Sequence, residues 1–132
     1  MSGRDILAAD LSRLALEPEP IIQAGEILSY SAARHDLELA PGAIARLKSL
    51  KVPVQGLGFV ICEGRAPLLA GAFWTPLSSL SFDGLTINVP LGSEDTTVHL
   101  YTGYPMQDEA AINDPRADAR LLEAFRRAGK LR

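Results

Sequence analysis

The chain has few of the side chains that form disulfides and metal sites. Cysteine occurs once, as Cys62, and histidine occurs twice, as His35 and His99, in 132 residues. One cysteine excludes a disulfide within the chain, as is usual for proteins of a reducing compartment. Zinc sites usually contain close pairs such as His-x3-His or Cys-x2-Cys, and the chain has neither. A metal site would have to bring His35, Asp36 and His99 together, so we expect no metal and no bound cofactor.

Long apolar runs are also missing. No stretch approaches the roughly 18 consecutive apolar residues of a membrane span. Residues 1–11 mix charged with apolar side chains and lack the continuous hydrophobic region of a signal peptide. Together with the single cysteine, this pattern predicts a cytoplasmic protein that makes no contact with a membrane.

The glycines do not form a phosphate-binding loop. Gly56 and Gly58 make a single Gly-x-Gly that enters an apolar run, whereas a dinucleotide fingerprint leaves a strand and opens a helix. The chain also lacks the Gly-Lys-Ser or Gly-Lys-Thr sequence of a P-loop. These two nucleotide-binding motifs are therefore excluded.

The composition predicts a folded domain. Hydrophobic residues make up 47% of the chain and the net charge is −3, which together exclude a disordered chain. A chain of 132 residues suits one domain. We expect an N-terminal helix and proline-containing arm over 1–20, and a single α+β domain over 21–132.

Three segments have the pattern of helices. Apolar residues spaced three and four apart predict a helix over 2–14, which the prolines of 17–20 end. A short helix is expected to begin at Pro41, because proline is tolerated in a first turn. The last helix is expected to follow Asp114 as its N-cap, with Gly129 just beyond its end.

Six segments have the alternating or continuous apolar pattern of strands. We expect 58–62 to be a central strand that is buried on both faces. We expect 85–89 to pair with 97–101, with Thr86 pointing outward. Gly71 lies inside a strand and indicates a bulge or a close approach. The six segments are 26–30, 36–39, 58–62, 68–74, 85–89 and 97–101.

The order of these elements predicts the α+β class. The expected architecture is one small sheet of about six strands, mostly antiparallel or mixed. Helices are expected at the N-terminus, in the middle and at the C-terminus. A β-grasp-like arrangement is one version of this fold.

The segment 70–84 is the most unusual part of the chain, because it joins aromatic side chains to clustered hydroxyl groups. Ligand pockets are mostly apolar and contain a few placed polar groups, so this loop is a candidate ligand site. The competing interpretation is that its aromatic residues are core and its serines satisfy turn backbone. The candidate ligand-binding residues are Trp74, Thr75, Ser78, Ser79, Ser81 and Asp83.

A dispersed catalytic site is an alternative. Ser79, His99 and Asp83 offer the residue types of a nucleophilic triad, although the chain has no Gly-x-Ser-x-Gly elbow. Cys62 is a further candidate nucleophile, but its neighbour Glu63 is acidic and does not stabilise a thiolate. We therefore predict no catalytic residue.

Basic charge is concentrated at the C-terminus. Residues 115–132 hold six of the 13 basic residues and two of the 16 acidic residues. This segment could bind nucleic acid or an acidic partner, or it could dock on its own domain. Because no nucleic-acid motif accompanies it and the isoelectric point is 5.3, we do not expect nucleic-acid binding.

The leading functional hypothesis is non-catalytic binding of a small molecule or a protein partner. The competing hypotheses are an enzyme with a site around Ser79, Asp83, His99 and Cys62, and a structural or assembly protein. An amphipathic first helix must bury its apolar stripe, either on its own sheet or on a second copy. We therefore also consider a two-fold homodimer.

Overall fold

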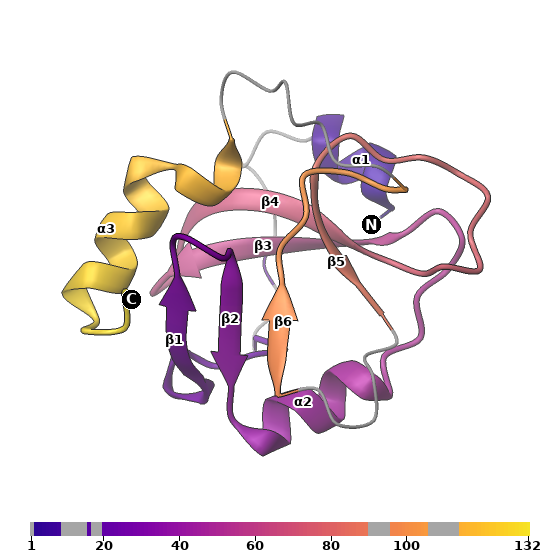
Figure 1. The fold of residues 1–132 in the computed structure, drawn as a ribbon. Helices are drawn as coiled ribbons and strands as arrows, with labels where there is room; N and C mark the ends of the chain where they lie inside the picture. Colours follow the sequence, from indigo (N-terminus) through magenta and orange to yellow (C-terminus); the bar gives the residue numbers. More distant parts are fainter. Residues whose placement is uncertain (1, 9–15, 17–19, 90–95, 106–113) are drawn as a thin grey trace.

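The computed structural model describes residues 2–8, 16, 20–89, 96–105 and 114–132, and its strands form two sheets (Figure 1). The first sheet has the order β1-β2-β6 and the second has the order β3-β4-β5. The elements are α1 (Gly3–Ala8), η2 (Ala24–Glu26), β1 (Ile27–Ser31), β2 (Asp36–Leu39), α2 (Pro41–Lys48), β3 (Leu57–Glu63), β4 (Ala66–Trp74), β5 (Leu85–Asn88), β6 (Thr97–His99), η3 (Pro115–Ala117) and α3 (Ala119–Arg127).

The α+β class is confirmed, but the single sheet that we expected, and the β-grasp-like version of it, are replaced by two sheets of three strands. β6 pairs antiparallel with β2, with Asp36 opposite His99, and does not pair with β5 as expected. The segment then crosses to the second sheet, where the backbone of Tyr101 exchanges two hydrogen bonds with Thr86 at 2.8 and 2.9 Å. One short segment thus joins both sheets.

The second sheet mixes the two strand directions. β3 and β4 form an antiparallel hairpin, and β4 and β5 are parallel. Gly71 lies where the neighbouring strands approach closely, because a Cβ atom there would be 2.4 Å from the Leu85 carbonyl oxygen and 2.6 Å from the ring of Phe59. The close approach that the sequence predicted is therefore confirmed.

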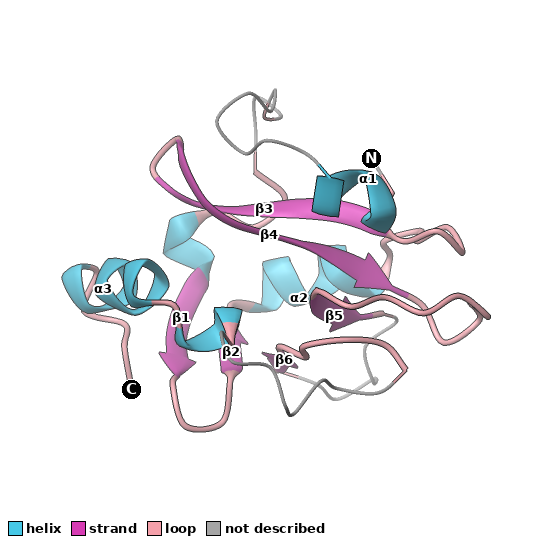
Figure 2. Cartoon of the chain, turned by 90° about the horizontal axis from the view of Figure 1, so that it is seen from above, coloured by secondary structure: helices cyan, strands magenta, loops and turns pink. Residues whose placement is uncertain are grey.

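The main core fills the space between the two sheets (Figure 2). Leu47 of α2 and Leu121 of α3 are buried there with the strand residues. Tyr30 of β1 is fully buried and stacks on Phe125 of α3 at a centroid distance of 4.8 Å. Its hydroxyl donates a 2.8 Å hydrogen bond to the Arg116 carbonyl, and burial raises its pKa to about 12.

A second, smaller core lies on the opposite face of the second sheet. Trp74 is only 2% exposed and stacks on Phe82 with ring centroids 5.1 Å apart. α1 covers this face and adds the buried side chain of Ile6. Trp74 therefore lies outside the main core. Its neighbour Phe73 lies within it, because successive strand residues point to opposite faces.

Two further expectations need correction. Asp114 caps the short helix η3, and the N-cap of α3 is Asp118, whose carboxylate accepts a 2.8 Å hydrogen bond from the Arg120 backbone. Thr86 is fully buried, because the Tyr101 backbone pairs with it from the neighbouring segment. Both differences arise from contacts that the local pattern does not contain.

The packing of Trp74 generates a first prediction. Gly56 has a φ of +79°, and a Cβ atom there would lie 2.3 Å from the Trp74 ring, whereas Gly64 has a φ of +61° and open space around it. We expect Gly64→Ala to cost about 1–2 kcal/mol from backbone strain alone. Gly56→Ala should cost about 2–4 kcal/mol, since it adds overpacking to strain. Urea unfolding of the two variants measures the difference, and equal losses would show that Trp74 does not pack on Gly56.

Candidate functional site

β3 is the outer strand of its sheet and not the central strand that we expected. The residues from Leu57 to Cys62 are all half-buried, whereas β4 is fully buried from Gly71 to Trp74. β4 is its partner on one side, and no other described segment forms a backbone hydrogen bond with it. The long apolar run therefore reflects packing on both faces of an edge strand, whose outer edge has no backbone partner among the described residues.

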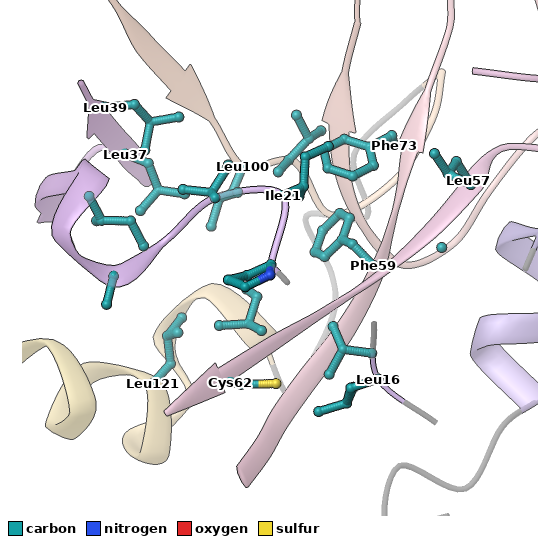
Figure 3. Close-up of a pocket in the computed structure, with 18 of the residues that line it drawn as sticks. Leu16, Ile21, Leu37, Leu39, Leu57, Phe59, Cys62, Phe73, Leu100 and Leu121 are labelled. Carbon is teal, nitrogen blue, oxygen red and sulfur yellow. The ribbon is translucent and has the colours of Figure 1, made fainter. Parts of the chain in front are cut away.

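A cavity of about 590 Å³ follows this strand (Figure 3). Its volume is within the usual range for ligand sites, roughly 300–1,000 Å³. Leu37, Leu39 and Leu100 contribute from the first sheet, and Phe73 contributes from β4. The lining residues are Ile6, Leu16, Pro20, Ile21, Ile22, Ala24, Ile27, Leu37, Leu39, Leu57, Gly58, Phe59, Val60, Ile61, Cys62, Arg65, Phe73, Ile87, Leu100, Leu121 and Phe125.

Leu16 and the segment 20–24 also line the cavity. Ile21 and Ile22 of this segment pack against the main core. Figure 3 shows Ile21 near Phe59 and Phe73, and Leu16 at another part of the cavity. With the residues from β3 and from the first sheet, the site is built from parts of the chain that are far apart in sequence.

Among the described residues that line the cavity, Cys62 and Arg65 are the ones whose side chains carry a thiol or a charge. Both lie near the turn that joins β3 to β4. Burial raises the pKa of the Cys62 thiol, and the nearby Arg65 charge opposes this only in part. Cys62 is thus held as a neutral thiol, which is a poor nucleophile.

Half of the predicted ligand loop is structural. The Ser78 hydroxyl donates a 2.6 Å hydrogen bond to the Val54 carbonyl and accepts a bond of 3.1 Å from the Leu80 backbone. Thr75 is buried and accepts a 3.3 Å bond from the Leu77 backbone. With Trp74 in the smaller core, these three residues stabilise the loop and the sheet.

The other half of the loop faces outward. Ser79, Ser81 and Asp83 are exposed, and none of the described residues of 75–84 lines the cavity along β3. Beside them, Leu77 is 87% exposed at the tip of the loop. Ligand binding stays a prediction for all six candidate residues, Trp74, Thr75, Ser78, Ser79, Ser81 and Asp83.

A second group of polar side chains lies on the first sheet, where the register of β2 and β6 brings histidines and a carboxylate together. His99 Nδ1 lies 2.7 Å from an Asp36 carboxylate oxygen, and its ring meets Tyr101 edge-on at 4.5 Å. The ring of His35 is 6.5 Å from that of His99. His99 thus pairs with Asp36, and the structure gives it no hydrogen bond with Ser79 or Asp83.

These side chains do not form a metal centre. Across the described ranges, no group of three His, Cys, Asp or Glu residues is placed to hold a metal ion. The Nδ1 atom of His35 is buried without a hydrogen-bond partner among the same residues. His35 is instead held by the turn, where its φ is +59° and its carbonyl accepts a bond from Leu100.

The basic residues of 115–132 bind mostly to their own domain. Arg127 forms an ion pair of 2.6 Å with Glu63 at the end of β3, and this pairing lowers the pKa of Glu63. Lys130 donates a hydrogen bond to the Ala24 carbonyl. Further pairs with carboxylates of the chain are Arg116–Asp114, Arg120–Asp118 and Arg126–Glu123.

Comparison with known protein families, curated proteins and solved structures gives no match for this chain. In the part of the chain that the structure describes, no helix is long and apolar enough to cross a membrane. The function is therefore inferred from the geometry of the cavity and of the group formed by His35, Asp36 and His99.

The apolar run of β3 is a sequence pattern that is consistent with the cavity. The unusual composition of the segment 70–84 directed the predicted ligand site to that loop instead. The run 58–62 is predicted to be a central strand buried on both faces, and Ile21 and Ile22 begin the predicted domain 21–132. Consecutive apolar or small residues in a strand are equally typical of an edge strand covered on both faces. Only the strand order distinguishes the two cases.

The environment of His35 generates a prediction of pH dependence. Burial, followed by the Arg116 charge, lowers the pKa of His35 from its usual 6.5. The unfolded chain therefore binds more protons as the pH falls through that value, so stability present above about pH 6.5 is lost below it. We expect His35→Asn, which tolerates the positive φ, to flatten the loss between about pH 7.5 and pH 5.5. Urea unfolding at both pH values measures this, and parallel losses in both proteins would contradict it.

Proposed function

We propose that the chain is a non-catalytic binding protein whose ligand occupies the cavity along β3. The observation that carries the proposal is the cavity itself, about 590 Å³ in volume and lined mainly by apolar side chains from both sheets, α1, α3 and the segment 20–24. Burial of apolar surface is the main driving force for a ligand there. A cytoplasmic setting, expected from the single cysteine, is part of this proposal.

The chemistry of the lining favours binding over catalysis. Cys62 has a raised pKa, and no carboxylate or imidazole lines the cavity within the described ranges. General acid–base catalysis requires a group that gains and loses protons near neutral pH within reach of the substrate. The lining offers apolar contact and one guanidinium, which suit recognition.

Ala24 allows a direct test, because it is exposed, lines the cavity and has a small side chain. We expect Ala24→Phe to fill the entrance and weaken the binding of Nile red, an apolar fluorescent dye, about tenfold or more. Ala45→Phe is the matched control, since Ala45 is an equally exposed alanine on α2 outside the lining. Fluorescence titration measures both affinities.

Cys62 provides a second readout within the same experiment. It lines the cavity and is half-buried, so an occupant should shield its sulfur. We expect saturating Nile red to slow the reaction of Cys62 with N-ethylmaleimide in the wild type and in Ala45→Phe. Equal dye affinity in all three proteins, with no protection of Cys62, would overturn the proposal.

A second candidate function is acid–base catalysis at His99. The 2.7 Å contact between Asp36 and His99 Nδ1 favours it, because a carboxylate on one ring nitrogen orients the imidazole and leaves the other to accept a proton. In this candidate site, Asp36 takes the place that Asp83 had beside His99 in the triad considered from the sequence. The side chains of both residues are about one-third exposed, so a substrate could reach them.

The catalytic candidate is tested with p-nitrophenyl acetate, an activated ester. If His99 is a general base, the wild type should hydrolyse the ester faster than an equal concentration of imidazole. His99→Gln should lose that excess, whereas His35→Asn and Ala24→Phe should keep it. Hydrolysis at the rate of free imidazole would exclude this function.

Self-association is a weaker competitor. Ile6 of α1 is only 4% exposed and packs against the second sheet of its own chain. The described part of the first helix therefore already has a partner for its apolar side chain. Sedimentation of the full chain as a monomer at tens of micromolar would exclude the homodimer.

A further inference from the structure

We propose that the ligand of this cavity is an extended peptide from a partner protein, bound as an added strand on β3. This inference rests on the proposed function and names its ligand class. The first observation is the shape of the cavity lining along β3. Every residue from Leu57 to Cys62 contacts the cavity. Because successive residues point to opposite faces of a sheet, a cavity that touches all of them follows the edge of the strand.

The edge of β3 has the chemistry that a peptide matches. Alternate residues of β3 direct their N–H and C=O groups away from β4, and among the described residues no backbone group bonds to them. A purely apolar molecule would cover these polar groups without replacing their hydrogen bonds with water, which is costly. An extended peptide would supply a donor or acceptor to each of them.

The two faces of the strand give such a peptide two rows of side-chain contacts. On one side, Phe59 and Phe73 pack with ring centroids 5.0 Å apart, and Ile21 lies near them. On the other side, Val60 packs against the smaller core that contains Ile6. Since peptide side chains alternate in the same way, apolar residues are expected at successive positions. The strand from 57 to 62 rises about 17 Å, enough for five or six residues.

Charge indicates how one end of the peptide is recognised. Arg65 lines the cavity beside the turn between β3 and β4, and no acidic side chain lines it among the residues that the structure describes. Glu63, the nearest carboxylate in sequence, is paired with Arg127 at 2.6 Å. A guanidinium has five N–H donors, so Arg65 can bind a carboxylate while it also contacts the protein. We therefore expect an acidic residue, or the terminal carboxylate, at this end of the peptide.

A second copy of the chain does not match the same space. Its own β3 would approach with β4 attached on the far side, as a two-stranded hairpin. Pro20, Ile21 and Ile22 line the same cavity as β3, so a second hairpin would have to enter a space that this segment already borders. A single extended peptide fits this arrangement.

The probe is a random library of peptides of about ten residues, displayed on phage and selected against the wild type. Phage that also bind Ala24→Phe are discarded. The best peptide is synthesised with a fluorescent label, and its affinity is measured by anisotropy. We expect selected sequences to have an apolar core flanked on one side by Asp or Glu, and the peptide to protect Cys62 from N-ethylmaleimide.

Backbone methylation distinguishes strand pairing from side-chain contact alone. N-methylation removes one N–H at a time, and we expect every second position of the peptide to lose about tenfold or more in affinity while the positions between are tolerated. Arg65→Glu should weaken binding by about tenfold. Lys51→Glu is the charge control, since Lys51 is exposed and outside the lining, and it should leave the affinity unchanged.

The outcomes separate this inference from the proposed function. If Nile red binds the cavity and protects Cys62 but no peptide is selected, the peptide ligand is wrong and the binding function stands. If peptides bind without a period-two response to N-methylation, strand addition is wrong. If neither dye nor peptide shields Cys62, both proposals are wrong.

Discussion

The structure depends on one constraint, which is that the second sheet is packed on both faces. Strand alternation sends Phe73 into the space between the sheets and Trp74 to the opposite side. The inner face joins this sheet to the first sheet, and the outer face requires the cover that α1 and Phe82 provide. A sheet covered in this way has apolar strands throughout, and the outer strand β3 is no exception.

The candidate site follows from this constraint. An edge strand with apolar side chains on both faces and a segment of chain alongside produces an apolar channel at the edge. The cavity along β3 is therefore a consequence of how the two cores meet and does not depend on a special motif. Arg65 adds a positive charge to its described lining, next to the turn where the hairpin reverses.

The titratable groups lie elsewhere. Asp36 and His99 face each other across β2 and β6 of the first sheet, and His35 occupies the turn beside them. Cys62, the titratable thiol at the cavity, is held neutral by burial. The Asp36–His99 pair thus lies outside the cavity lining, although Leu37 and Leu39 of the same strand β2 contribute to that lining.

Local patterns in the sequence determined most of the elements. Alternation and proline placement located β1, β2 and β5 to within one residue at either end, and the start of α2 at Pro41, because pleating and the missing proline N–H act on neighbouring residues. Strand alternation places Phe73 and Trp74 on opposite faces of β4. The α+β class and the number of strands followed from the same signals.

Tertiary structure alone decided the strand order and, with it, the site. Whether 58–62 is central or at an edge depends on which strands pair with it, and pairing partners distant in sequence leave no local periodicity. The same holds for β6, which joins β2 instead of β5, and for Asp36, which meets His99 only through that register. The hydroxyl-rich loop resembled a ligand site because composition reports which groups are present, whereas hydrogen bonds such as that from Ser78 to Val54 decide whether they are free to bind.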